Sequence, residues 1–367
     1  MVIDSKTLSS ADYPQNPKTT RISRFFSQGN FVVVVVAMII LSTIRSGIRL
    51  GANLDVYRSD SLAFPNIPFF YKSSLIMPIT TQLFGLDNSI RWIAFYSLVT
   101  LLTLAITATF VFRLRTTNNA RMLFALIVFS QLHVIMLTEL GKFDLFLILG
   151  SIVLIFGRTF PFQLLGALSI TMGNFEQSIV VLGALLLFSL STDNDLKFRR
   201  LASIGTIAVI SQYLFLDLAY GSWSADGGDS RLNWFTANWF RFLKANVASL
   251  PTLIYSGYGA CWVIIAIYIS KGSTTRNRFI HFTCLIFIPL AITLTTFDGT
   301  RIWVLISAPL LLVALQSFTS LKSPLFPKFQ PSVLFVVFIG LLTPALIVEV
   351  EGKIKIPYLH LWNMLSN

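Results

Sequence analysis

"FVVVVVAMIILSTIRSGIRLGANLDVYRSD" (residues 31–60) begins as a continuous apolar run and then becomes abruptly polar. Its first fourteen residues carry no charge, and the apolar run extends to about residue 48. A run of nearly twenty apolar residues has the length that a helix needs to cross the hydrocarbon core of a bilayer. We therefore predict a first transmembrane helix over residues 31–48, followed by residues that lie at a membrane surface.

The whole chain continues this pattern. Of its 367 residues, 54% are hydrophobic and 12% are charged, whereas soluble domains average about 25% charged residues. We predict one transmembrane domain over residues 31–350, a cytoplasmic tail over residues 1–30 and a short C-terminal tail over residues 351–367. The first tail is polar, and the run after it lacks a small-residue cleavage site, so we interpret it as a tail rather than a signal peptide.

Hydropathy predicts an all-α, polytopic membrane protein with about eleven transmembrane helices, in a range of roughly nine to twelve. The breaks within residues 144–192 depend only on "GRTFP" (157–161) and "GNFEQ" (173–177). The expected spans are 31–48, 90–112, 122–138, 144–157, 160–174, 177–192, 201–220, 248–270, 279–297, 302–320 and 332–350.

Charge placement predicts the orientation. With the N-terminus inside, the inner segments hold sixteen of the 28 basic residues but only four of the 16 acidic ones, which is the bias expected of cytoplasmic loops. The net charge of +12 then lies on one side. This implies anionic membrane lipids as partners and no nucleic acid, because no basic stripe with interleaved aromatic residues occurs in a soluble region.

Two outer loops are long. Residues 45–89 contain "SSLIMPITTQLFGLDN" (73–88), which is too short to span and predicts an interfacial or re-entrant helix. Residues 221–247 mix aromatic and basic residues, as is typical of the headgroup level. This second loop forms either a helix on the outer leaflet or a gate over a substrate groove.

Residues 41–60 hold the first candidate site. If the first helix continues past Ile44, Arg45 and Arg49 share one face, and two guanidinium groups suit a phosphate or diphosphate. Asp55 or Asp60 could then take a proton from a hydroxyl nucleophile. Alternatively, both arginines reach the outer headgroups and the aspartates balance their charge.

"TELGKFDLFLIL" (138–149) places Glu139, Lys142 and Asp144 at a predicted outer junction. Glu139 and Lys142 could simply pair with each other. Asp144 directly adjoins an apolar run, and an ionisable group at membrane depth indicates a functional site. His133, inside the preceding span, could bond to a neighbouring helix or carry protons.

Two further junctions carry polar groups. Glu176 and Gln177 could hydrogen-bond sugar hydroxyls or could belong to an ordinary helix cap. Asp298 could cap a turn and pair with Arg301. In the alternative interpretation, Arg301 grips an anionic substrate.

Soluble-enzyme signatures are absent: the sequence has no G-x-x-x-x-G-K-[ST], H-E-x-x-H or G-x-S-x-G. The three histidines are far apart, and the two cysteines lack metal-site spacing. We therefore predict no metal ligands of these types, and we expect any chemistry to use carboxylates and arginines.

These features together resemble the integral-membrane glycosyltransferases of the GT-C class and related exopolysaccharide-polymerase-type proteins. The resemblance depends on a first span that ends in an acidic loop, an interfacial helix, short paired helices and a late outer arginine. The stretches that carry it are "LDVYRSD" (54–60), "GKFD" (141–144), "NFEQ" (174–177) and "FDGTR" (297–301).

The resemblance implies transfer of a sugar from a polyprenyl-phosphate or polyprenyl-diphosphate donor on the extracytoplasmic side, to a glycan, lipid or protein acceptor. Asp55 would be the catalytic base, with Asp60 second, and Arg301 would meet the donor phosphate with Arg45 or Arg49. The first outer loop lacks the paired acidic residues that many members carry, which leaves a divalent cation open as a cofactor. Further substrate contacts are expected from Arg58, Glu139, Lys142, Asp144, Glu176, Gln177 and Asp298.

Two other classes stay open. A secondary transporter or flippase would use acidic residues and His133 to relay protons or bind an anionic solute, and it predicts charges near the midplane and internal symmetry. A non-catalytic partner in a larger membrane complex is the third. The absence of an Asn-x-Ser/Thr sequon favours a bacterial plasma membrane.

Overall fold

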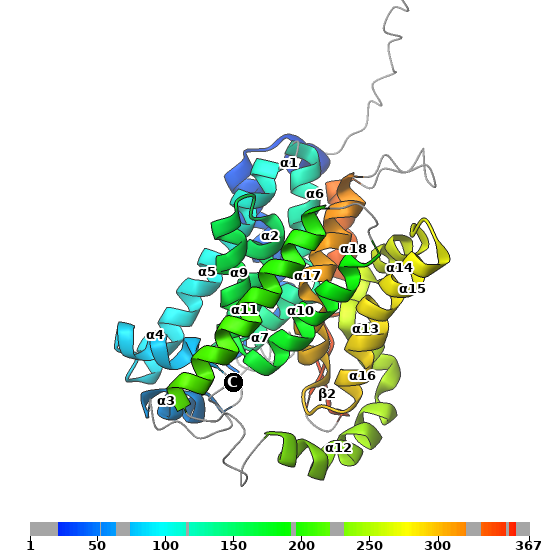
Figure 1. Cartoon of the computed structure of the whole chain (residues 1–367). Coiled ribbons are helices and arrows are strands. Elements are labelled where there is room, and N and C mark those ends of the chain that lie inside the picture. The colour runs from blue at the N-terminus through cyan, green and yellow to red at the C-terminus, as the bar shows by residue number, and fades with distance from the viewer. Residues whose placement is uncertain are drawn as a thin grey trace, which may run out of the picture.

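The computed structural model is almost entirely helical, with one two-stranded sheet (Figure 1). Several of its helices are long and apolar, so the chain is an all-α, multi-pass membrane protein. The predicted tails up to residue 20 and from residue 357, and residues 221–230 of the second outer loop, lie outside the described residues. The structure describes residues 21–51, 53–63, 74–114, 117–191, 196–220, 231–320, 332–349 and 352–356.

Five helical segments in the described part of the chain are long and apolar enough to cross a membrane. Three are single helices, and two are continued through short 3-10 or π turns. The single helices are α5 (Ser89–Leu114), α11 (Leu196–Tyr220) and α17 (Gly299–Ser320). The composite ones are α13 (Leu250–Tyr258) with α14 (Trp262–Ser270), and α15 (Thr275–Phe282) with α16 (Ile288–Leu294).

Two bent helix pairs raise this number to seven if each pair is one span. The first pair, α1 (Arg21–Gln28) and α2 (Phe31–Ser46), is bent by 112°. The second, α6 (Thr117–Val128) and α7 (Gln131–Thr138), is bent by 49° within the predicted span 122–138. The shorter apolar helices are α8 (Asp144–Phe156), α9 (Phe160–Gly173), α10 (Phe175–Ser189) and α18 (Val333–Leu342).

Capping residues explain these bends. The side chain of Asn30 accepts hydrogen bonds from the backbone N–H groups of Val32 and Val33 at the start of α2. Ser130 accepts one from Leu132 at the start of α7. Such bonds satisfy donors that have no partner within a helix, and so they allow a new helix to begin inside an apolar run.

The predicted breaks at residues 157–161 and 173–177 are confirmed. Pro161 lies in the first turn of α9, where its missing N–H costs little. Asn174 caps α10 by accepting a hydrogen bond from the N–H of Gln177 at 2.9 Å. Helices α8 and α9 approach each other closely at Gly150. A Cβ atom on this residue would lie 2.6 Å from the carbonyl oxygen of Gly166, so the contact requires a glycine.

Helix α17 forms the centre of the bundle and packs against α6, α8, α10 and α16 (Figure 1). In its most apolar stretch, 78% of the residues are buried, compared with 39–44% in the other four long segments. A residue at the beginning of α17 therefore sits at the centre of one end of the bundle.

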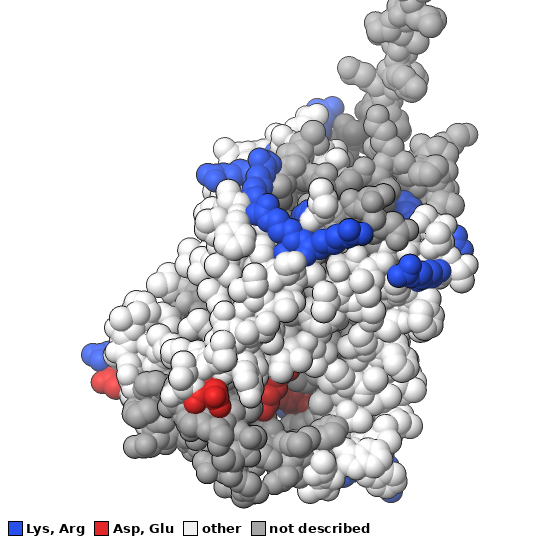
Figure 2. Space-filling view, viewed as in Figure 1, with Lys and Arg blue, Asp and Glu red and all other residues white. Residues whose placement is uncertain are grey.

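The remaining elements gather at that end, which we call the α3 end; the opposite end, with α1, is the α1 end (Figure 1). On the face drawn in Figure 2, Lys and Arg lie mostly towards the α1 end, whereas Asp and Glu lie at the α3 end. The elements of the α3 end are α3 (Leu54–Leu62), α4 (Ile76–Phe84), α12 (Arg231–Ala248), β1 (Ile347–Val348) and β2 (Ile354–Lys355).

The short helix predicted within residues 73–88 is confirmed as α4. It buries Met77 and Thr81 and exposes Leu83 and Phe84, so its apolar side chains do not all face the protein.

The prediction of one helix over residues 332–350 is wrong. Helix α18 ends at Leu342, because Thr343 is extended and Pro344 cannot continue the helix. The chain then forms β1, which pairs antiparallel with β2.

Candidate functional site

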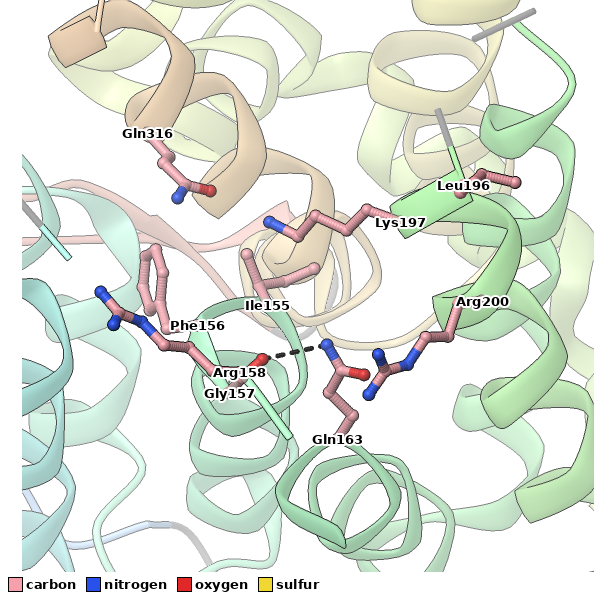
Figure 3. Close-up of a pocket in the computed structure, with 9 residues that line it drawn as sticks. All are labelled: Ile155, Phe156, Gly157, Arg158, Gln163, Leu196, Lys197, Arg200 and Gln316. Atoms are coloured by element: carbon pink, nitrogen blue, oxygen red, sulfur yellow. Dashed lines mark hydrogen bonds between the residues drawn. The ribbon is translucent and has the colours of Figure 1, made fainter. Parts of the chain in front are cut away.

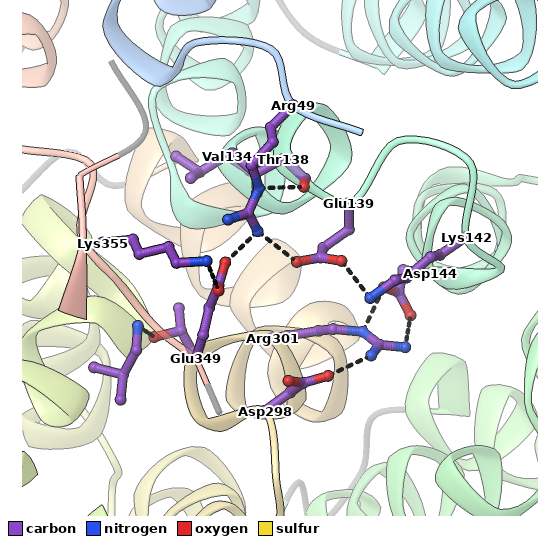
Figure 4. Close-up of polar contacts among 12 residues, drawn as sticks. Arg49, Val134, Thr138, Glu139, Lys142, Asp144, Asp298, Arg301, Glu349 and Lys355 are labelled. Carbon is purple, nitrogen blue, oxygen red and sulfur yellow. Dashed lines mark hydrogen bonds and ion pairs between the residues drawn. The ribbon is translucent and has the colours of Figure 1, made fainter. Parts of the chain in front are cut away.

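Eight charged side chains gather at the α3 end, where ion pairs join five of them in one series and the other three in a second (Figure 4). We call this set the charge network. Its four cations and four carboxylates balance. The members are Arg49, Glu139, Lys142, Asp144, Asp298, Arg301, Glu349 and Lys355.

Arg49 lies in the segment after α2. Gly47, with φ 68°, ends α2, because this left-handed conformation suits glycine and leaves the helical path. The chain then runs beside the end of α7, where the N–H of Arg49 donates to the carbonyl of Leu137 at 3.0 Å. This places the Arg49 Nη2 atom 3.2 Å from Glu139 Oε1.

The turn between α7 and α8 carries Glu139, Lys142 and Asp144. Gly141 at its centre has φ 96°, and its carbonyl accepts a hydrogen bond from the Trp92 indole of α5 at 3.0 Å. Lys142 Nζ lies 2.7 Å from Glu139 Oε2. The local pair that the sequence suggested therefore exists, and both side chains are only 6% exposed.

The first turn of α17 carries Arg301, whose guanidinium is held by two carboxylates. Its Nε and Nη2 atoms donate to the two oxygens of Asp144 at 2.5 and 3.0 Å, and its Nη1 atom donates to Asp298 at 2.6 Å. The guanidinium also stacks over the Phe143 ring, with its carbon 5.2 Å from the ring centroid. We call Asp144, Asp298 and Arg301 the Arg301 trio; all three guanidinium nitrogens already have a carboxylate partner.

The β1–β2 hairpin adds two members that the sequence analysis missed. Glu349 forms ion pairs with both Arg49 and Lys355, and we call these three residues the Glu349 trio. The hairpin is attached to α17, because the N–H of Val348 donates to the Thr300 hydroxyl at 2.8 Å. An acidic residue at the end of an apolar run is a signal that could have identified Glu349, but the sequence analysis places residue 349 inside a transmembrane helix.

Charge is divided unevenly within the network. The Arg301 trio has one more carboxylate than cations, whereas the Glu349 trio has one more cation than carboxylates; Glu139 and Lys142 lie between them (Figure 4). The cations of the two trios differ in exposure, because the Arg301 side chain is 8% exposed, whereas those of Arg49 and Lys355 are 20% and 39% exposed. The more accessible cations therefore belong to the Glu349 trio.

Arg45 is not part of this network, and the prediction that it shares a helical face with Arg49 is wrong. Because α2 ends at Ser46, Arg49 lies outside the helix. The buried Arg45 donates to the carbonyls of Thr343 (2.8 Å) and Phe129 (3.0 Å). These carbonyls lie at the ends of α18 and α6, where a cation is favourable.

Asp55, Arg58 and Asp60 lie on α3, beside the network. The Asp55 side chain is 82% exposed, lies 3.2 Å from Arg58 and accepts a hydrogen bond from Ser89. Another side chain of α3, Tyr57, packs against Phe143 and lies under the Lys142 ammonium. Partial burial raises the pKa of Asp60 above its ordinary value.

Other predicted groups lie apart from the network. Glu176 and Gln177 belong to the first turn of α10 and are not members, and the helix cap at this junction is formed by Asn174. His133 is buried in α7, and neither ring nitrogen has a hydrogen-bond partner within the described residues.

Within the same described ranges, no three His, Cys, Asp or Glu side chains are grouped so that they could hold a metal ion. Cys261 and Cys284 are free and buried.

Comparisons with known proteins leave the site to be interpreted from its own chemistry. No family model, no curated protein and no solved structure matches this chain. The arrangement of carboxylates and cations at the α3 end is therefore the basis on which a function can be proposed.

Proposed function

We propose that this chain is a glycosyltransferase or polysaccharide polymerase of a bacterial plasma membrane that uses a polyprenyl-phosphate-linked sugar donor. The N-terminus is cytoplasmic, and the α3 end faces outward. The single observation that carries the proposal is the uneven division of charge between the Glu349 trio and the Arg301 trio.

The donor phosphate binds at the Glu349 trio. Arg49 and Lys355 converge there on one carboxylate, and both are more exposed than Arg301. A phosphate can bridge such a pair of cations, and an arginine can contact it through two nitrogens. Arg49 and Lys355 replace Arg301 as the first contacts of the phosphate. Arg49 and Arg301 each pair with two carboxylates, but the Arg301 side chain is only 8% exposed, whereas that of Arg49 is 20% exposed.

The Arg301 trio lies on the sugar side. When the bond between sugar and phosphate breaks, the sugar ring becomes positively charged and the leaving phosphate gains negative charge. A group with one excess carboxylate next to a group with one excess cation stabilises both changes. Asp298 is the accessible carboxylate of the trio, with its side chain 22% exposed.

The acceptor hydroxyl loses its proton to Asp55. A catalytic base must be reachable by the acceptor, and the Asp55 carboxylate is exposed. Helix α3 connects this carboxylate to the network, because Tyr57 touches both Phe143 and Lys142. Asp60 is the second candidate, since its raised pKa makes its carboxylate a stronger base.

The test uses the full-length protein in liposomes with polyprenyl-phosphate-linked glucose, mannose or a pentose as donor, together with glycan, lipid and peptide acceptors that carry free hydroxyl groups. The measurement is the release of free polyprenyl phosphate. Asp55→Asn should slow this release by roughly 10²-fold or more while the protein remains folded. Asp87→Asn is the matched control, because Asp87 is an exposed carboxylate that pairs with Arg91 at the same end, and its loss should leave the rate unchanged.

Two results would contradict the proposal. Release by Asp55→Asn within twofold of the wild-type rate would reject Asp55 as the base. No release from any of these donors, together with proton-coupled uptake of an anionic solute into the liposomes, would identify the protein as a secondary transporter.

A further inference from the structure

A second charged region lies at the α1 end, away from the charge network. The ends of α8, α9, α11 and α17 surround a cavity of about 430 Å³ there (Figure 3). We call it the α1-end cavity. Its volume is in the range of small-molecule sites, about 300–1,000 Å³.

The polar lining of this cavity is positively charged. Arg158 comes from the turn between α8 and α9, and its Nη2 atom donates to the carbonyl of Arg113 at 2.5 Å. Lys197 and Arg200 come from the first turns of α11 (Figure 3). The described residues that line the cavity include no Asp or Glu. An anion bound beside Lys197 and Arg200 would be stabilised by both cations.

Gln163 supplies a second, independent observation. Its side chain is almost fully buried, and its Nε2 atom donates to the Gly157 carbonyl at 2.9 Å. Its Oε1 atom is buried and has no hydrogen-bond partner within the described residues. A buried acceptor without a donor is unfavourable, so this oxygen indicates a ligand that brings an N–H or O–H group.

The cavity also has an apolar part. Leu196 also lines the cavity and is 78% exposed, which provides an apolar edge beside the charged groups.

We propose that the α1-end cavity binds a phosphate ester that also carries a hydroxyl group. Lys197 and Arg200 contact the phosphate, and Gln163 accepts a hydrogen bond from the hydroxyl. The glycerol-phosphate headgroup of an anionic phospholipid and soluble glycerol phosphate share this chemistry. The exposed Leu196 favours the lipid, whose acyl chains can extend along the outside of the bundle.

The test measures binding to the full-length protein in a neutral detergent, by native mass spectrometry and by the shift in thermal unfolding. The probes are phosphatidylglycerol, phosphatidylmethanol, phosphatidylcholine and glycerol 3-phosphate. Phosphatidylglycerol should bind at least tenfold more tightly than phosphatidylcholine, which has no net charge. It should also bind more tightly than phosphatidylmethanol, which has the same charge but no headgroup hydroxyl.

The variant K197Q/R200Q should weaken phosphatidylglycerol binding at least tenfold. Arg199→Gln is the matched control, because Arg199 precedes Arg200 in α11 but does not line the cavity, and its variant should bind like the wild type. If glycerol 3-phosphate binds the wild type and K197Q/R200Q abolishes this, the ligand is a soluble phosphate ester and the site is still supported.

Three results would overturn the inference. The first is equal binding of phosphatidylglycerol and phosphatidylcholine without binding of glycerol 3-phosphate. The second is an equal loss of phosphatidylglycerol binding in Arg199→Gln and K197Q/R200Q, which would mean that the lipid is attracted by general surface charge. The third, equal binding of phosphatidylglycerol and phosphatidylmethanol, would remove the role of Gln163. Sugar transfer at the α3 end is measured separately, so failure here does not depend on the proposed function.

Discussion

Arg301 and Asp144 form a two-point ion pair, with Arg301 Nε 2.5 Å from one carboxylate oxygen and Nη2 3.0 Å from the other. The pair joins the first turn of α17 to the first turn of α8, although the two residues are 157 positions apart in the chain. Both side chains are buried. The pair therefore fixes the central helix relative to the turn that carries Glu139 and Lys142.

Breaking this pair should strongly destabilise the protein. Asp144→Asn or Arg301→Gln leaves a buried charge without its main partner, which should lower the free energy of unfolding by about 3 kcal/mol. The double variant should lose less than the sum of the single variants, because it leaves neither charge behind. Reversible unfolding in detergent micelles measures all three values.

The exposed pair of Asp87 and Arg91 is the control for this cycle, since both side chains are more than half exposed. Its double-mutant cycle should show no measurable coupling. If the losses in free energy of unfolding for the Asp144 and Arg301 variants simply add in the double variant, the two side chains do not stabilise each other.

Gly141→Ala should also destabilise the fold. Gly141 has φ 96°, and an added Cβ atom would lie 2.7 Å from the Leu54 side chain. The strained backbone should cost about 1–3 kcal/mol and displace Lys142 from Glu139. Gly183→Ala is the matched control, because within the described residues nothing outside its own stretch of helix lies within 4 Å of its Cβ position; that helix should not be weakened. Equal unfolding temperatures for both variants would contradict this explanation of the turn.

Asp60 should make stability depend on pH. Burial raises its pKa in the folded protein, so the folded state holds this proton more tightly than the unfolded state does. The contribution of Asp60 to the free energy of unfolding should therefore fall as the pH rises from the ordinary carboxyl range through the folded pKa, and then level off. Asp60→Asn cannot titrate and should unfold at a higher temperature than the wild type at pH 7.

This advantage of Asp60→Asn should disappear in acid below the ordinary carboxyl pKa. Thermal unfolding of both proteins across this pH range measures it. A constant difference between the two curves, or one that grows as the pH falls, would show that the carboxyl group is not penalised by burial.

Lys355 and Glu349 should have opposite effects on the affinity for the proposed donor. Lys355→Gln removes a cation from the Glu349 trio and should raise the KM for a polyprenyl-phosphate-linked sugar about fivefold, which corresponds to about 1 kcal/mol. Glu349→Gln removes the competing carboxylate and should lower that KM. Steady-state kinetics in liposomes measure both.

Lys353→Gln is the control for this comparison, because Lys353 has the same charge, is exposed, and lies two residues before Lys355. Its KM should match the wild type. Equal increases of KM for the Lys353 and Lys355 variants would indicate attraction to the whole hairpin rather than binding at the Glu349 trio.

Local features of the fold could be predicted from the sequence. The breaks at residues 157–161 and 173–177 follow from proline and from a capping asparagine, which act on their own neighbours. The ion pairs of Glu139 with Lys142 and of Asp298 with Arg301 join residues three positions apart. The bend at Ser130 was missed, because a single capping serine gives little signal within a long apolar run.

The sequence by itself determined that the chain is a bundle of apolar helices and that six of the eight charge-network residues lie near the ends of apolar runs, because segment length, caps and loop charges act locally. Only the tertiary structure decided how the charges are paired. Arg49 meets Glu349 across 300 positions because a hairpin, rather than a longer helix, returns to α17. Arg45 is separated from Arg49 because one glycine ends α2 between them. The partner of a buried charge depends on which helices pack together, and that choice minimises the free energy of the whole chain.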